Sequence, residues 1–126
     1  AGLFSTAPDL AIIMQMLLNG GTYGGKRYLK EETIRQFTTR QSNQSTRGIG
    51  WDTKNPMRSW AGTLLSNKTF LHTGFTGTSV VADPERKLIV ILLTNRVHPT
   101  RYTAKIGEVR PKVHDAVARA LKQTRQ

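Results

Sequence analysis

The chain has 126 residues, enough for one domain or for one part of a larger domain. It contains no cysteine, which excludes a disulfide framework and a thiolate metal site. The net charge is +11, but the basic residues are spread over the last hundred positions without a run of four. Because nucleic-acid-binding surfaces concentrate their charge and carry a recognisable motif, we expect a basic solvated surface and no specific nucleic-acid partner.

The first predicted element is a helix that begins near Thr6. Thr6 suits the N-cap, Pro8 suits the first turn, and Asp9 completes a capping box three residues after Thr6. Apolar side chains then recur at helical spacing, at Leu10, Ile13, Met14 and Leu17. The two glycines that follow Asn19 predict the end of this helix.

A tight turn and a second helix are predicted next. The Gly-Gly pair at 24–25 predicts a turn between two short strands. A phosphate-binding loop is the alternative at this point, but it needs Ser or Thr after the Lys, and Arg27 stands there. Acidic residues in the first turn support a short helix from about Lys30 to Thr38.

The middle of the chain is mostly irregular. Residues 41–48 are uniformly polar and predict a loop, whereas alternating residues over 49–53 predict a first strand. Residues 54–69 show no period, and a loop of this length in a compact domain is commonly functional and often lines a cleft. Trp60 lies in this loop, where it either covers the edge of the sheet or forms a platform for a substrate.

The central feature of the sequence is a predicted antiparallel hairpin. Residues 70–83 predict its first strand, 83–86 predict a type I turn, and the apolar run 88–93 predicts a strand covered on both faces. Gly74 and Gly77 would let the first strand run flat, so that a ligand could approach its backbone closely. We therefore expect the polar edge of this strand to carry the function.

The last predicted element is a helix that begins near Pro111, with the proline in its first turn. Its apolar side is predicted to comprise Val113, Ala116, Val117, Ala120 and Leu121. The elements together predict an α/β fold of the α+β type, in which a three-stranded antiparallel sheet is flanked by helices.

His72-Thr73-Gly74, followed by the predicted strands, resembles the Lys-Thr-Gly motif of the serine β-lactamase and penicillin-binding-protein superfamily, with His in place of Lys. The resemblance is greatest to the class C and esterase-like branch of that superfamily. Further segments match in the family's order across nearly the whole chain, namely Ala1–Leu10, Gly48–Trp51, His72–Gly77 and Leu93–Arg96.

Two other motifs of this family are absent from the chain. No serine is followed three residues later by Lys, and no tyrosine has Asn two residues on. The resemblance therefore implies that residues 1–126 form the C-terminal part of a single β-lactamase-like domain. It also implies that the nucleophile lies in a missing N-terminal part, which would be the partner of this chain.

The resemblance also assigns roles to individual residues. It implies that the backbone N–H of Phe75 is an oxyanion donor and that His72 is a side-chain donor in the same cleft. It places Thr73, Gly74 and Thr76 along the bound substrate. Arg101 is the candidate anchor for a substrate carboxylate. It implies neither a metal nor a cofactor.

Two hypotheses of different classes follow. The first is the substrate-strand portion of a serine acyl hydrolase, of the β-lactamase, esterase or D-Ala-D-Ala peptidase type, that is inactive alone. Because His carries less charge than Lys at pH 7, His72 would favour ester or uncharged substrates over β-lactam carboxylates. The second is a non-catalytic binding or assembly module with weak affinity for anionic polymers. The resemblance suggests a bacterial protein of the periplasm or cell envelope, and an incomplete sheet suggests a homodimer.

Overall fold

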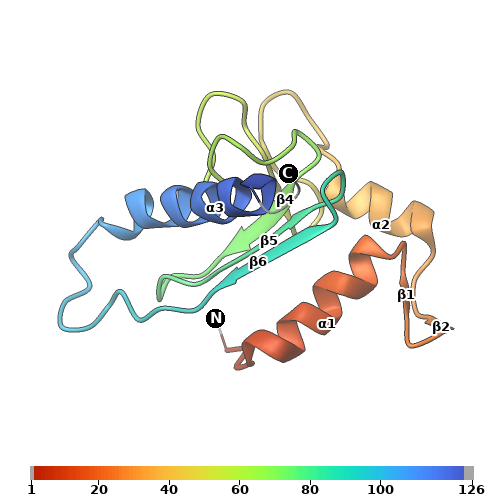
Figure 1. The fold of residues 1–126 in the computed structure, drawn as a ribbon, viewed down its shortest axis with the longest axis horizontal. Coiled ribbons are helices and arrows are strands. Elements are labelled where there is room, and N and C mark those ends of the chain that lie inside the picture. The colour runs from red at the N-terminus through yellow and green to blue at the C-terminus, as the bar shows by residue number, and fades with distance from the viewer. Residues whose placement is uncertain (1, 124–126) are drawn as a thin grey trace.

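The computed structural model describes residues 2–123, in which three α-helices flank a four-stranded antiparallel sheet (Figure 1). Ala1, the first residue of the N-terminal segment matched above, lies outside this range. The sheet has the strand order β3-β4-β5-β6, and β1 and β2 form a separate hairpin. The elements are α1 (Ala7–Leu18), β1 (Thr22–Tyr23), β2 (Lys26–Arg27), α2 (Glu31–Thr38), β3 (Asp52–Thr53), β4 (Phe70–Thr73), β5 (Ser79–Asp83), β6 (Leu88–Leu92) and α3 (Ile106–Gln123).

Helices cover the sheet on both faces, with α1 and α3 on opposite sides (Figure 1). Because successive residues of a strand point to opposite faces, the register sorts the apolar side chains into two cores. Leu71, Val81 and Val90 pack with Ala118 of α3. The neighbouring row packs against Met14 of α1 and comprises Phe70, Ala82 and Ile89.

The helix α1 begins where the capping box predicts. The Asp9 N–H donates to Thr6 Oγ1 at 3.3 Å, and the Thr6 hydroxyl donates to the Asp9 carboxylate at 2.8 Å. The helix ends before Gly20, whose φ of 64° suits glycine. The predicted β1–β2 hairpin and the short helix α2 are also confirmed.

The antiparallel sheet flanked by helices is confirmed, but the strand predicted over 70–83 is two strands. A turn over 74–78 separates β4 from β5, which raises the strand number of this sheet from three to four. The Gly74 N–H donates to the Thr78 carbonyl at 2.9 Å, and the Gly77 N–H donates to the Gly74 carbonyl at 3.1 Å. Gly77 has a φ of 103°, so the glycines reverse the chain here and do not flatten it.

The start and the buried side of α3 also differ from the prediction. The helix begins at Ile106, so Pro111 lies inside it and not in its first turn. Three of the residues predicted for the apolar side are exposed, namely Ala116, Ala120 and Leu121. The buried side instead carries polar groups, which the fold supplies with partners from distant segments; these residues are Arg110, His114 and Asp115.

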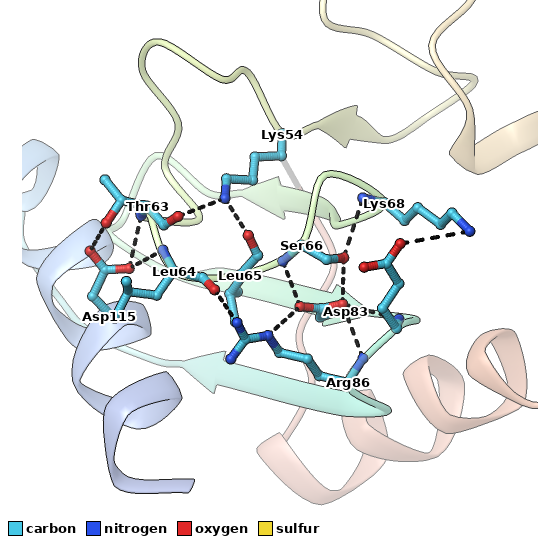
Figure 2. Close-up of polar contacts among 10 residues, drawn as sticks. Lys54, Thr63, Leu64, Leu65, Ser66, Lys68, Asp83, Arg86 and Asp115 are labelled. Carbon is cyan, nitrogen blue, oxygen red and sulfur yellow. Dashed lines mark hydrogen bonds and ion pairs between the residues drawn. The ribbon is translucent and has the colours of Figure 1, made fainter. Parts of the chain in front are cut away.

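The irregular segment 54–69 is fixed to the sheet and to α3 by buried polar side chains (Figure 2). Asp115 of α3 accepts hydrogen bonds from the N–H groups of Thr63 and Leu64, at 2.8 and 2.9 Å. At the near end of the segment, the Lys54 ammonium donates to the carbonyls of Thr63 and Leu65.

Asp83, at the end of β5, anchors the other end of this segment (Figure 2). Its fully buried carboxylate accepts hydrogen bonds from the N–H and the hydroxyl of Ser66, at 2.7 and 2.6 Å. It also lies 3.4 Å from Arg86, whose guanidinium donates to the Leu64 carbonyl at 2.5 Å. The segment was predicted to be a functional loop, and these contacts show that its backbone is held in place by the core.

Candidate active site

The strand β4 has an open edge at the predicted motif. It pairs with β5 along its whole length, but β3 pairs only with Phe70 and Leu71. The edge of β4 at His72 and Thr73 is therefore unpaired on the β3 side within the described residues. The His72 side chain is exposed and makes no hydrogen bond to the described part of the chain. An extended ligand could pair with this edge.

The turn over 74–78 places Phe75 directly after this edge. The Phe75 ring is 60% exposed, and its N–H makes no hydrogen bond to any residue that the structure describes. A Cβ at Gly74 would collide with the Thr78 hydroxyl, so the narrow turn alone accounts for a glycine at this position. The N–H of Phe75 is thus a free backbone donor on a sterically fixed turn.

Two arginines from outside the hairpin hold this turn. Arg110 of α3 donates from Nη2 to the carbonyls of Gly74 and Thr78, at 2.7 and 2.9 Å. Arg96, which follows β6, donates from Nε to the Phe75 carbonyl at 2.7 Å. Three carbonyls of one five-residue turn are therefore bound by guanidinium groups, which give stronger hydrogen bonds than neutral donors.

An open hollow of about 490 Å³ lies beside the turn. It is lined by Phe75, Thr76, Val97, Pro99, Thr100, Arg101 and Tyr102. The guanidinium carbons of Arg96 and Arg101 lie over the Phe75 ring, 4.3 and 5.0 Å from its centroid. The structure therefore brings Phe75, Thr76 and Arg101 together, and His72 and Thr73 lie on the strand that leads into the turn.

Trp60 packs against the start of α3. Its ring would be in close contact with any Cβ at Gly107, and its face lies 5.7 Å from the Arg110 guanidinium. Its carbonyl lies 2.7 Å from His114 Nδ1. These contacts are with α3 and not with the edge of the sheet, and Trp60 is 36% exposed, so both predicted roles of Trp60 stay predictions.

A buried serine–histidine pair lies beneath the site. His114 Nδ1 lies 2.7 Å from the Trp60 carbonyl, so this nitrogen carries the proton, and Nε2 accepts from the Ser79 hydroxyl at 3.3 Å. Burial lowers the pKa of His114, and the nearby charge of Arg110 lowers it further. The hydrogen bond to Trp60 and the charge of Asp115 raise this pKa in part. Ser79 and His114 are 2% and 0% exposed, so the pair is closed to a substrate and acts in packing.

The sequence predictions did not include Arg96, Arg110 or His114 among the residues around the site. Arg96 is the last residue of the matched segment Leu93–Arg96, which is a usable sequence signal. Arg110 and His114 recur at helical spacing, but their partners lie more than thirty residues away in sequence. Among the described residues, no three His, Asp or Glu side chains gather as metal ligands would. None of the described helices has the length and hydropathy needed to cross a membrane.

The chain is similar to known proteins in both sequence and structure. A protein of Escherichia coli (strain K12) named "Putative D-alanyl-D-alanine carboxypeptidase" is 42% identical over 100 residues, which are 78% of this chain and 23% of the relative. A protein of the same name from Salmonella gallinarum is 41% identical over 109 residues, which are 85% of this chain and 25% of the relative. The chain thus spans about a quarter of the length of these relatives.

A solved structure shows the fold, and a family model gives the family. The crystal structure of a beta-lactamase from Mycobacterium bovis superposes with a TM-score of 0.71 at 24% identity, over 90% of this chain and 43% of that one, which shows the fold. The family model described as Beta-lactamase matches residues 1–113. The chain therefore belongs to the Beta-lactamase family.

Proposed function

We propose that this chain supplies the substrate-binding strand and one oxyanion donor of a serine acyl hydrolase that cleaves β-lactams, esters or D-alanyl peptides. One observation carries the proposal: the open edge of β4 leads directly to a backbone N–H, that of Phe75, which no described residue uses. Acyl transfer requires such a donor where negative charge develops on the carbonyl oxygen.

The residues of the site divide the work of binding and catalysis. The amide of an extended substrate pairs with the β4 edge at His72 and Thr73, which aligns its carbonyl with the Phe75 N–H. His72 donates from its ring to the substrate, and the Thr73 and Thr76 hydroxyls bind its polar groups. Arg101, on the wall of the hollow, binds a substrate carboxylate. Gly74 places no side chain beside the substrate at the end of the strand.

The nucleophile is proposed to come from a preceding part of the same protein. No serine of this chain has a Lys three residues later, and Ser79 is buried. The relatives share this chain over only about a quarter of their length, which leaves room for the remaining motifs. Their names suggest D-alanyl-D-alanine peptides as the substrate class. The family resemblance suggests the bacterial cell envelope as the location.

The experiment is covalent labelling followed by mass spectrometry of the intact protein. The chain alone, incubated with a fluorescent penicillin or a chromogenic ester, should gain no mass. The longer protein, or the chain mixed with its N-terminal part, should gain the mass of one acyl group on a serine of that part. A labelled serine on this chain would contradict the assignment. Labelling of neither part would favour the non-catalytic module instead.

A further inference from the structure

The peptide group between Gly74 and Phe75 is bound on its carbonyl side only. Its carbonyl accepts from Arg110 Nη2 at 2.7 Å and from the Gly77 N–H at 3.1 Å. Its N–H has no partner among the described residues. In a planar trans peptide the C=O and N–H point in opposite directions, so Arg110 holds one side of this group and leaves the other side free.

We propose that Arg110 is a positioning residue for acyl transfer, which fixes and polarises the Gly74–Phe75 peptide so that its N–H becomes a better oxyanion donor. The inference rests on the function proposed above, because it gives the Phe75 N–H the oxyanion role. Arg110 acts through the peptide group and does not touch the substrate.

The physical basis is hydrogen-bond cooperativity. A cation bound to a carbonyl oxygen draws electron density toward that oxygen, which makes the N–H of the same peptide more acidic and a stronger donor. Linked hydrogen bonds strengthen one another by roughly 10–30% per bond. The second contact, from Arg110 to the Thr78 carbonyl, ties the two ends of the turn together, so the direction of the N–H is fixed as well.

The environment of Arg110 argues against a role in packing alone. The residue is 6% exposed, has no carboxylate partner in the described part of the chain, and leaves its Nε without a hydrogen bond there. Burial and the nearby Arg96 charge lower its pKa, yet an arginine stays protonated at neutral pH. Burying an unpaired charge is unfavourable, and an apolar residue of similar volume would often fold as well. The described groups that contact this charge are the Trp60 ring and the two carbonyls of the turn, so its hydrogen bonds go to the turn that carries the Phe75 N–H.

The kinetic test uses the complete enzyme that carries this chain. In Arg110→Met, kcat for a chromogenic ester should fall about tenfold or more while KM changes less than about twofold, because the oxyanion contact strengthens in the transition state. Arg110→Lys keeps the charge and should recover part of the loss. Lys112→Met removes an exposed cation from the same helix and should leave kcat unchanged.

An inhibitor separates an oxyanion effect from a general loss of order. A boronic acid forms a tetrahedral anionic adduct with the serine, whereas an uncharged product amide binds without gaining negative charge on its carbonyl oxygen. Arg110→Met should weaken the boronic acid by about tenfold and the product by less than about twofold. Equal weakening of both ligands would mean that Arg110 only maintains the structure, and would overturn the inference.

A spectroscopic test does not depend on activity. The chain has four Phe residues, so selective ¹⁵N-Phe labelling gives a simple amide spectrum in which Phe75 can be assigned. Loss of the cation should shift the Phe75 amide proton upfield in Arg110→Met and leave it in place in Lys112→Met. If Arg110→Met does not fold, Arg110→Gln replaces it in the kinetic and spectroscopic tests, because glutamine keeps a hydrogen-bond donor and removes the charge.

The outcomes distinguish the two proposals. If the complete wild-type enzyme forms no acyl adduct, the proposed function fails, and the Phe75 amide shift alone decides whether Arg110 polarises the peptide. If the wild type is active and a folded Arg110→Met variant keeps full kcat, the positioning role is wrong and the proposed function stands. An unmoved Phe75 amide would overturn the inference in either case.

Discussion

Arg110 and His114 lie one helical turn apart on the buried side of α3, and the fold treats them differently. Arg110 keeps its charge although burial lowers its pKa, because the ordinary pKa of arginine lies far above neutral pH. His114 is held neutral, since burial lowers its pKa and Nδ1 already donates to the Trp60 carbonyl. The protonated histidine would lose the hydrogen bond that Nε2 accepts from Ser79.

The neutral His114 predicts a pH dependence of stability. His114 takes up a proton near pH 6.5 in the unfolded chain and only at lower pH in the folded chain. The contribution of His114 to the free energy of unfolding is therefore complete above about pH 6.5, and it falls as the pH decreases toward the pKa of the folded chain. Urea unfolding between about pH 7 and pH 5 should show this slope, and His114→Gln should reduce it. His98→Gln, at an exposed histidine, should keep the slope. An unchanged slope in His114→Gln would contradict the prediction.

A second prediction at this scale concerns His72. In the complete enzyme, His72→Ala should lower kcat/KM for ester substrates. The lost transition-state stabilisation should be about 1–3 kcal/mol, the range for the loss of one donor to a polarised group. Lys87→Ala, an exposed cation in the turn at the far end of the sheet, is the matched control and should have no effect. Wild-type turnover of both ester and β-lactam substrates by His72→Ala would remove His72 from the site.

At the scale of elements, local patterns predicted what local forces determine. The capping box at Thr6 and the Gly-Gly turn predicted α1 and the first hairpin, because their partners lie within a few residues. The turn over 74–78 was missed although it contains two glycines, since the same residues were interpreted as a flat strand in the family motif. The start of α3 was misplaced because Pro111 was taken as a first-turn residue.

The polar buried side of α3 could not be predicted from the sequence. Periodicity alone identifies apolar stripes, whereas Arg110 and His114 are satisfied by carbonyl and hydroxyl groups of distant segments. For the same reason, the sequence indicated the strand of the candidate site but not the arginines that hold the turn after it. Hydrogen bonds between distant segments become visible only when the fold is known.

The anchor at the end of β5 gives a prediction for this element. Asp83→Ala should lower the free energy of unfolding by about 3 kcal/mol, because it removes a buried carboxylate that binds Ser66, the next turn and Arg86. Glu85→Gln, at an exposed carboxylate of the same turn, should change it by less than about 0.5 kcal/mol. Chemical denaturation of both variants measures the difference. Similar stabilities would mean that the segment 54–69 does not depend on Asp83.

At the scale of the whole molecule, the sheet has an unprotected edge. β6 is the last strand in the order, and no other described strand pairs with its outer side. Its sequence is entirely apolar, Leu-Ile-Val-Ile-Leu, without the charges or prolines that usually protect an edge. In the complete protein, a strand from the preceding part is proposed to pair here.

The open edge predicts that the chain alone self-associates. Its molar mass from light scattering should rise with concentration. Ile91→Lys should lower this mass toward that of a single chain, because a charge on the edge strand opposes strand addition. Ile12→Lys, at an exposed isoleucine of α1, should leave the mass unchanged. A mass of one chain for the wild type at every concentration would contradict the prediction.

The way in which the segment 54–69 is fastened affects which of its positions can vary. Lys54 and Arg86 donate to its carbonyls, and Asp115 accepts mainly from its amides, so the path is held largely through groups that every amino acid possesses. Exposed side chains of the segment, such as Met57, Arg58 and Asn67, can therefore be exchanged without changing its course. The positions that determine its shape lie partly elsewhere, at the end of β5 and on α3, and partly at Lys54, Gly62 and Ser66 within it, so homologous sequences can diverge at the exposed positions of this loop while keeping the same backbone.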